Sequence, residues 1–284
     1  MKAKKIEEKF FRVLMFLSTM FICMVLFLIL FSILRSGLPY LSWEMISSVP
    51  SGGYYFGKEG GILNAIIGTL YLSLGSTLLA FVTGLPVALM MNVHLASMPR
   101  FVNSIRLILD LLWGIPSIVY GAFGFTIMIY LGIRASLLAG IITVTLFVLP
   151  IMIRAMDEAL KTVPKGLLET ALSLGSTRSE ISYRVFFKQC IPGMITAVLL
   201  SFGRAAGDVA SVLFTTGFTD HIPTSLNQPA ATLPLTIFFQ LSSPIEEVRQ
   251  RAFAAAVVLV IIILFISILT RVLSRKYHKN RINF

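Results

Sequence analysis

An arginine and an aspartate, Arg204 and Asp208, lie within a stretch of sequence that is otherwise apolar enough to cross a membrane. They are the only charged residues between Ile191 and Gly217. A charged side chain at the centre of a bilayer costs at least a few kcal/mol, so each of them must face protein or water. A guanidinium donates paired hydrogen bonds to oxyanions, whereas a carboxylate accepts hydrogen bonds.

Two interpretations of this pair require no ligand. Residues four apart share one face of a helix, so Arg204 and Asp208 could neutralise each other along it. Alternatively, each could pair with a neighbouring helix and fix the packing of a helical bundle. A third interpretation is an anion site, in which the guanidinium is the group that binds.

The composition is that of a protein that crosses a membrane several times. Of the 284 residues, 56% are hydrophobic and 13% are charged, against roughly 25% charged in soluble proteins. About 20 helical residues span a hydrocarbon core. Six stretches reach this length, near residues 10–34, 62–91, 107–131, 136–154, 191–217 and 252–273. We therefore expect an all-α membrane protein with six transmembrane helices.

The positions of the basic residues predict the orientation of the chain. Most of the 24 Lys and Arg residues lie at the two ends of the chain, after the second span and after the fourth. Basic residues gather on the cytoplasmic side of a membrane protein, so both termini are expected there. The first apolar run is too long for a signal peptide and is expected to be a retained helix.

Nothing in the sequence indicates catalysis or a metal site. The three histidines are scattered over both predicted sides, and no nucleophile can be placed beside a base. Gly52–Glu59 fits the beginning of a phosphate-binding loop, but Glu59 stands where a Ser or Thr would hold magnesium. We expect no catalytic residue, no metal ligand and no cofactor.

Other polar residues and glycines near the spans are interpreted as structural. Arg106 and Asp110 are four residues apart and are expected to form a local ion pair. The sequence Gly114–Ser117, "GIPS", and the glycines Gly121 and Gly124 are expected to permit bending or close contact between helices.

Residues 155–190 form the most polar segment between spans. Pro164 predicts a break before a short helix and Gly175 predicts its end. Five apolar residues between them are expected to share one face: Leu167, Leu168, Ala171, Leu172 and Leu174. Such a helix either lies on the bilayer surface or docks in the groove of a cytoplasmic partner.

The sequence "ETALSLG", Glu169 to Gly175, resembles the EAA motif of ABC importer permeases, in which a short coupling helix inserts into the ATPase subunit. Glu169, Ala171 and Gly175 occupy the Glu, Ala and Gly positions of that motif. Thr170 stands where Ala is usual, and "VFFK" (Val185 to Lys188) replaces the usual I-x-L-P ending.

Three further segments resemble the phosphate-specific permeases of the PstA type. They are "WGIPSIVYGAFG" (residues 113–124), "RAAGDVASVLFTTG" (residues 204–217) and "LPLTIFFQLSSPIEEVRQRAFAAAVVLVIII" (residues 233–263). The likeness covers residues from about 62 to 273. "LFTTG" and "SSPIEEVRQRAFAAA" favour this type over the sister permease subunit, PstC.

The resemblance implies a type I ABC importer permease fold in the inner membrane. It divides the chain into an N-terminal helix with an outer loop (1–61), a permease core (62–275) and a cytoplasmic tail (276–284). It also implies three kinds of partner: a second permease subunit, a cytoplasmic ATPase dimer that hydrolyses the ATP, and an extracytoplasmic phosphate-binding protein.

The resemblance also assigns roles to residues. Arg204 is expected to contact phosphate in the translocation path. Asp208, where the family usually has Glu, is expected either to orient Arg204 or to accept a hydrogen bond from the proton that phosphate keeps near neutral pH. The residues expected to couple transport to the ATPase are Glu169, Thr170, Ala171 and Gly175.

Two alternatives stay open at the level of sequence. The same architecture could carry another oxyanion, such as molybdate, sulfate or phosphonate, because one arginine does not distinguish them. A passive anion channel or a membrane scaffold is the other alternative, and the apolar face around "ETALSLG" argues against it.

Overall fold

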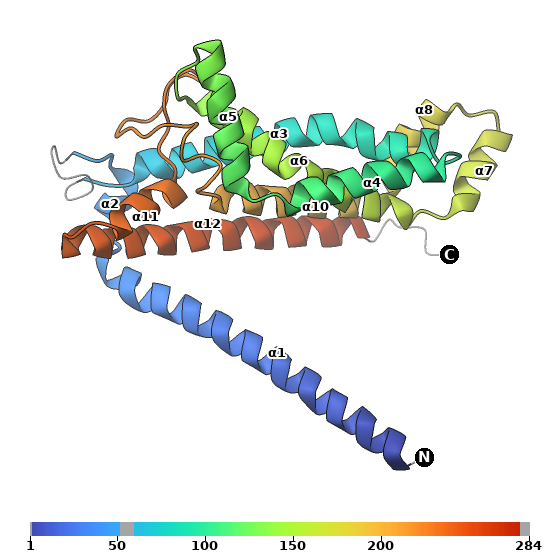
Figure 1. The fold of residues 1–284 in the computed structure, drawn as a ribbon, viewed down its shortest axis with the longest axis horizontal. Helices are drawn as coiled ribbons and strands as arrows, with labels where there is room; N and C mark the ends of the chain where they lie inside the picture. The colour runs from blue at the N-terminus through green and yellow to red at the C-terminus, as the bar shows by residue number, and fades with distance from the viewer. Residues whose placement is uncertain (1, 52–59, 279–284) are drawn as a thin grey trace.

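The computed structural model describes residues 2–51 and 60–278, and within these ranges the regular elements are helices. Most of them run along one long axis, while α1 diverges from the body and α5 projects from it (Figure 1). The Gly52–Glu59 match and the end of the tail predicted for 276–284 lie outside the described residues.

The first half of the chain contains α1 (Lys2–Gly37), the 3-10 helix η1 (Leu38–Tyr40), α2 (Trp43–Ser47), α3 (Leu63–Leu89), the π-helix η2 (Met90–His94), α4 (Pro99–Gly114) and α5 (Ser117–Leu131). The second half contains α6 (Leu137–Lys161), α7 (Lys165–Ser173), α8 (Arg178–Glu180), the π-helix η3 (Ile181–Phe186), α9 (Phe187–Gln189), α10 (Ile191–Gly207), α11 (Leu233–Leu241) and α12 (Glu246–His278).

Four helical stretches in the described part of the chain are long and apolar enough to cross a membrane: Glu7–Tyr40, Leu63–His94, Leu137–Lys161 and Glu246–Val272. Two more candidates are bent pairs of helices. The pair α4 and α5 bends by 91°, and Arg178–Gln189 bends by 76° against α10. The prediction of six spans therefore holds when each bent pair is counted as one span.

The span predicted near 107–131 is a bent pair of helices and not one continuous helix. Helix α4 ends at Gly114, and Ile115 is extended (φ −70°, ψ 129°) before Pro116. Proline disfavours the helical conformation of the residue before it, which explains a break at this position. The bending expected from Gly114–Ser117 is confirmed by the 91° angle between the two helices.

The helix predicted over 191–217 is also shorter than expected, because α10 ends at Gly207. Asp208 is extended (φ −84°, ψ 130°), and its Oδ2 accepts a hydrogen bond from the Ser211 backbone amide at 2.8 Å. An Asp side chain that bonds the amide three residues later favours a new turn over continuation of the helix. The residues after Asp208 are accordingly non-helical until α11.

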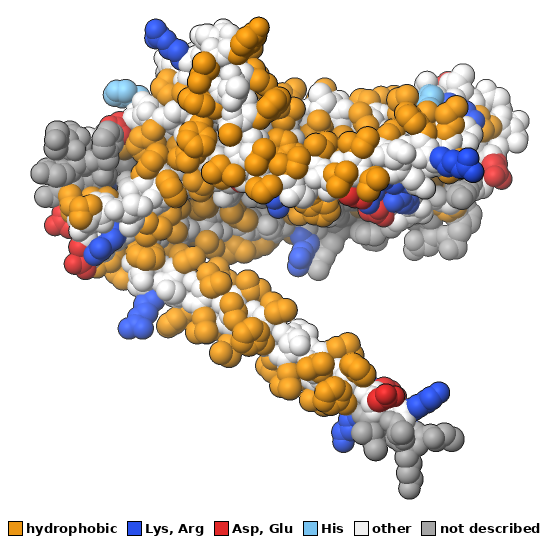
Figure 2. Space-filling model, viewed as in Figure 1, with side chains coloured by type: hydrophobic (Ala, Val, Ile, Leu, Met, Phe, Trp, Pro, Cys, Tyr) orange, Lys and Arg blue, Asp and Glu red, His pale blue; other side chains and the backbone are white. Residues whose placement is uncertain are grey.

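Helix α6 forms the centre of the body. Its fully buried side chains recur every four residues, in a stripe made of Val144, Val148, Met152, Met156 and Leu160. This spacing places them on one face of the helix. The described side chains of α1, by contrast, are largely exposed, and Figure 2 shows hydrophobic side chains covering most of its length.

The close helix contacts expected at Gly121 and Gly124 are confirmed. A Cβ atom at Gly121 would lie 2.6 Å from the Ala210 carbonyl oxygen, and one at Gly124 would clash with the Thr143 hydroxyl. Helix α5 therefore packs against α6 and against the segment after α10 only because these two positions lack a side chain.

Candidate functional site

Arg204 lies in the last turn of α10 with its side chain exposed on the surface of the chain. Its guanidinium carbon is 4.7 Å from the centroid of the Phe147 ring, which belongs to α6 and is 3% exposed. The electron-rich face of an aromatic ring attracts a cation at this distance. Phe147 therefore holds the guanidinium near the middle of the long axis of α6.

The ring of Phe147 is itself supported by the break between α4 and α5. Its centroid lies 5.7 Å from that of Tyr120, which is in the first turn of α5. The Tyr120 hydroxyl donates a hydrogen bond of 2.9 Å to the Leu112 carbonyl, in the last turn of α4. Arg204 thus lies where α6, α10 and the bent pair α4–α5 meet.

The guanidinium of Arg204 keeps its donors available. Among the described residues, no side chain or carbonyl accepts a hydrogen bond from it, and no carboxylate pairs with it. A ring face attracts the cation without accepting the paired N–H bonds that a guanidinium offers to an oxyanion. The arrangement is suited to binding an anion that enters from the exposed side of α10.

Asp208 does not pair with Arg204 in the described part of the chain, so the geometry does not support the interpretation in which the two neutralise each other along one helix. Asp208 lies beyond the end of α10, and its Oδ2 accepts from the Ser211 amide. The following turn, in which the Val212 and Leu213 amides donate to the Val209 carbonyl, begins from this contact. Asp208 is half-buried at the same end of α10 as Arg204.

The short helix expected between Pro164 and Gly175 is confirmed as α7. Pro164 is the residue before the helix, with φ −59° and ψ 132°. At the other end, the Ser176 amide donates to the Ala171 carbonyl and the Gly175 amide to the Leu172 carbonyl, which is a Schellman motif. Gly175 has φ 81°, a left-handed conformation that glycine adopts without strain.

The apolar residues of this segment do not share one face, so that part of the prediction is wrong. Leu167, Leu168 and Ala171 pack against the core of the protein. Leu172 and Leu174 point outward, and Leu174 is 80% exposed. Glu169 and Thr170, two of the predicted coupling residues, are exposed as well. The inner face of α7 therefore packs against the core of this chain. The outer face exposes two leucines, a carboxylate and a hydroxyl.

Sequence reasoning missed a cluster of charges around the buried Asp157, and the local pair expected between Arg106 and Asp110 is wrong. Arg106 donates from Nε and Nη2 to both oxygens of Asp157, each at 2.9 Å. Asp157 is fully buried in α6 and also accepts a 2.9 Å bond from the Asn92 amide. Asp110 instead accepts from Arg154 at 2.6 Å.

Two further cations complete this cluster. Arg154 also donates to Asp157 at 2.8 Å, and the Lys161 ammonium lies 3.2 Å from the same carboxylate. The cluster was missed because the fourth span was predicted to end at residue 154, whereas α6 continues to Lys161. The spacing of Arg154, Asp157 and Lys161, three and four residues apart on one helix, is the signal that would have found part of it.

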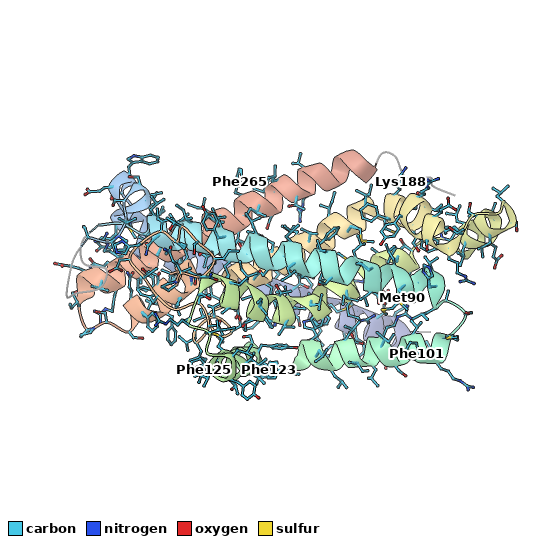
Figure 3. The ribbon with its side chains drawn as sticks, turned by 90° about the horizontal axis from the view of Figure 1, so that it is seen from above. Met90, Phe101, Phe123, Phe125, Lys188 and Phe265 are labelled. Atoms are coloured by element: carbon cyan, nitrogen blue, oxygen red, sulfur yellow. The ribbon has the colours of Figure 1, made fainter. Side chains whose placement is uncertain are left out.

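The segment after α7 is also fixed to the rest of the chain. Arg178 donates to the Val93 carbonyl in η2 at 2.6 Å, and Thr177 and Glu180 form a capping box at the start of α8. Met90, Phe101 and Lys188 lie toward this end of the molecule, away from Phe123 and Phe125 on α5 (Figure 3). Helices α3, α4 and α6 and the segment around α7 therefore meet at this end.

Comparison with known proteins gives one family over most of the chain. The family described as "Binding-protein-dependent transport system inner membrane component" matches residues 84–279. The PstA phosphate transport system permease protein of Pasteurella multocida is 30% identical over 272 residues, covering 95% of both chains.

Two other relatives carry related names. The PstA permease protein of Yersinia pestis is 34% identical over 251 residues, covering 87% of this chain and 83% of that protein. The probable PstA permease protein of the archaeon Methanocaldococcus jannaschii is 31% identical over 266 residues, covering 93% and 92%.

Solved structures support the fold. A chain from the inward-facing MetNI methionine ABC transporter superposes with a TM-score of 0.62 and 22% identity. The match covers 76% of this chain and 95% of that one. At this identity the likeness concerns the arrangement of helices and not the substrate.

Proposed function

The chain belongs to the family of binding-protein-dependent transport system inner membrane components, and from this membership we propose that it is the permease subunit of an ATP-driven importer of inorganic phosphate. The assignment of phosphate as the substrate rests on the likeness to phosphate permeases, which extends over 95% of the chain in the Pasteurella relative. Relatives named for the same substrate occur in both bacteria and an archaeon.

The chain is a membrane-spanning transport subunit of the type I ABC importer permease fold, and it works with an ATPase and other components. We propose that these are a second, related permease, a cytoplasmic ATPase dimer that carries out the ATP hydrolysis, and an extracytoplasmic phosphate-binding protein. In this assignment residues 62–275 are the transport core, and both termini lie in the cytoplasm.

Arg204 is proposed as the residue that contacts phosphate during translocation. Three observations support this role: the side chain is exposed, its donors are not used by the described residues, and Phe147 orients it. One guanidinium supplies two parallel hydrogen bonds to phosphate oxygens. A single site of this kind releases its ligand readily, as a translocation path requires.

Asp208 is proposed to select for phosphate through the negative charge of its carboxylate and through the proton that phosphate keeps near neutral pH. Its Oδ2 bonds the Ser211 amide, which fixes the carboxylate beyond the end of α10. A carboxylate repels a fully deprotonated oxyanion but accepts a hydrogen bond from a protonated phosphate oxygen. Because it is not paired with Arg204, the alternative role of orienting that guanidinium has no support from the geometry.

The outer face of α7 is proposed to dock on the ATPase. It presents Glu169, Thr170, Leu172 and Leu174 outward, while Gly175 ends the helix in a fixed conformation. Ala171 contributes by packing inward, which ties the helix to the core. Movement of the ATPases would then move α7 together with α6, because three residues join the two helices.

Uptake by the assembled transporter tests this function. The full chain is co-expressed with its second permease and ATPase, reconstituted in vesicles, and supplied with the binding protein, ATP and labelled phosphate. We expect ATP-dependent phosphate accumulation that excess sulfate and molybdate leave unchanged. Equal inhibition by both anions would defeat the assignment to phosphate, and accumulation without ATP would defeat the assignment to an importer.

A further inference from the structure

The second span ends in the π-helix η2, and the last turn of this span is held from two sides. The continuous helix Leu63–His94 ends there. The last four carbonyls of a helix have no partner within it and carry the negative end of the helix dipole. The Val93 carbonyl is among them, on a residue that is 0% exposed. A donor from elsewhere in the chain must therefore satisfy it.

The donor is Arg178, whose Nη1 lies 2.6 Å from the Val93 carbonyl oxygen although the two residues are 85 apart in sequence. Arg178 is the first residue of α8, which lies beside η2 (Figure 1). A hydrogen bond from a charged donor is stronger than one between neutral groups, and a cation at this end of a helix also interacts favourably with its dipole. The guanidinium therefore joins the end of the second span to α8.

The neighbouring residue of η2 joins the same turn to α6. The Asn92 amide nitrogen donates to Oδ1 of Asp157 at 2.9 Å and to the Ala88 carbonyl at 2.9 Å. A side-chain amide has two N–H donors, so both are used. One of them anchors Asn92 to its own helix, and the other anchors it to α6. Two adjacent residues of η2 thus contact α6 and α8.

Helices α6 and α8 are the two elements that flank α7. Residues 162–164 connect α6 to α7, and residues 174–177 connect α7 to α8. The second connection is fixed by the left-handed Gly175 and by the capping box of Thr177 and Glu180. Short connections of this kind pass a displacement of α7 to both flanking elements. Through Asn92 and Arg178, that displacement reaches η2 from both sides.

We propose that Arg178 is a positioning residue for energy coupling, which makes the Leu63–His94 span move together with α7. This inference rests on the proposed docking of α7 on the ATPase. Without the guanidinium, α7 stays attached to α6, but α8 separates from the end of the second span. Part of the movement of the ATPases is then absorbed between α8 and η2, and each ATP hydrolysed moves less phosphate.

The ratio of phosphate transported to ATP hydrolysed, measured on the assembled transporter in vesicles, tests this role. Arg178→Met removes the donor and keeps a long side chain. The ratio should fall about tenfold, the factor that corresponds to one lost hydrogen bond from a charged donor. Arg178→Lys should retain most of the ratio, because an ammonium also donates to a carbonyl. A loss of stability alone would lower transport and hydrolysis together and leave their ratio unchanged.

Arg184→Met is the matched control. Arg184 belongs to the same continuous helix, Arg178–Gln189, and its side chain is 76% exposed and 3.8 Å from the Glu180 carboxylate of that helix. The substitution removes the same charge and leaves Arg178 bonded to the Val93 carbonyl. Its ratio should equal that of the parent. An equal fall in Arg184→Met, or the parent ratio in Arg178→Met, would overturn the proposal.

Spin labels on α7 and after η2 give a measurement that does not depend on transport. They are attached at Ser173→Cys and Ala96→Cys, both on exposed residues, after Cys23 and Cys190 have been replaced. With Arg178 in place, the distance between the labels should stay the same when ATP binds. A distance that changes would overturn the proposal, even where Arg178→Met fails to assemble.

The outcomes separate this inference from the function on which it rests. Uptake without ATP would defeat the importer, and intact coupling in Glu169→Lys would defeat the docking of α7; the label distance then decides the role of Arg178. Normal coupling in the parent and its loss in Glu169→Lys, together with an unchanged ratio in Arg178→Met, would defeat the role of Arg178 alone.

Discussion

Asp157 accepts two parallel hydrogen bonds from Arg106, whose Nε and Nη2 each lie 2.9 Å from a different oxygen of the carboxylate. The pair joins α4 to α6 in the last two turns of α6, and the carboxylate is fully buried. A paired, bidentate geometry of this kind is stronger and more directional than a single contact.

Asp157→Asn should destabilise the assembled transporter more than neutralising any other charged residue of the cluster around Asp157. Removing one partner of a buried charge pair costs about 3–5 kcal/mol, since the cations left behind lose their counter-charge. We expect a clear fall in the thermal midpoint of the purified complex. Asp110→Asn is the control, because Asp110 is 46% exposed and its contact with Arg154 contributes less than about 1 kcal/mol.

The double variant Arg106→Met with Asp157→Asn, compared with each of its two single variants, separates charge balance from packing. If the fall in Asp157→Asn comes from uncompensated cations, removing Arg106 as well should restore part of the thermal midpoint. A double variant as unstable as the sum of the two single variants would show that the two residues act independently.

Arg204→Gln should abolish phosphate uptake while the complex still assembles. The change removes the positive charge from a side chain that has no hydrogen-bond or ion-pair partner among the described residues, so it leaves no buried polar group unpaired. Arg204→Lys should retain uptake, reduced about tenfold to a hundredfold, because an ammonium does not reproduce the bidentate fork. Co-purification of all subunits measures assembly, and its loss would identify Arg204 as a packing residue instead.

Phe147→Leu should lower phosphate uptake several-fold with little effect on assembly of the complex. A cation over an aromatic face gains about 0.5–2 kcal/mol, which corresponds to a change of roughly twofold to thirtyfold. Phe147→Tyr retains the ring and should retain uptake. If Phe147→Leu transports as well as the parent, the ring does not orient the guanidinium.

Tyr120→Phe serves as the companion to the Phe147 variants. It removes the hydrogen bond to the Leu112 carbonyl and leaves the ring beside Phe147 in place. Loss of such a bond costs about 1 kcal/mol. We expect a lower thermal midpoint with uptake by the remaining folded complex close to normal, measured per mole of assembled transporter.

Glu169→Lys should uncouple ATP hydrolysis from phosphate uptake. Glu169 is exposed on the outer face of α7, so the substitution reverses a charge at the proposed ATPase contact without disturbing the core. ATPase activity and uptake are measured on the same preparation. Lys188→Glu is a charge reversal of the same size and opposite sign at the exposed Lys188 of α9, and it should leave both activities unchanged. Full coupling in Glu169→Lys would remove α7 from the ATPase interface.

The sequence was most informative where one residue determines the backbone. Pro164 and Gly175 predicted both ends of α7, because proline fixes its own φ and glycine adopts the left-handed conformation that ends a helix without strain. Hydropathy likewise located the spans along the chain. It could not place the ends of α6 and α10, since both depend on polar contacts that form only in the fold.

The end of α10 illustrates this limit. Hydropathy treats Gly207–Gly217 as a continuous apolar run with one carboxylate, but the Asp208 side chain takes the Ser211 amide and ends the helix. The charge cluster was missed for a similar reason. The partner of Arg106 is 51 residues away in Asp157 and not four residues away in Asp110, and no local spacing contains that information.

The exposed position of Arg204 has a consequence for the production of the subunit. A copy inserted in the bilayer without its partners would leave a guanidinium on its surface, at a cost of at least a few kcal/mol. In the proposed assembly, a hydrated space enclosed by the second permease around the side chain would relieve that cost. An unassembled copy should then be less stable than an assembled one, and its abundance in the cell should follow the supply of the other subunits.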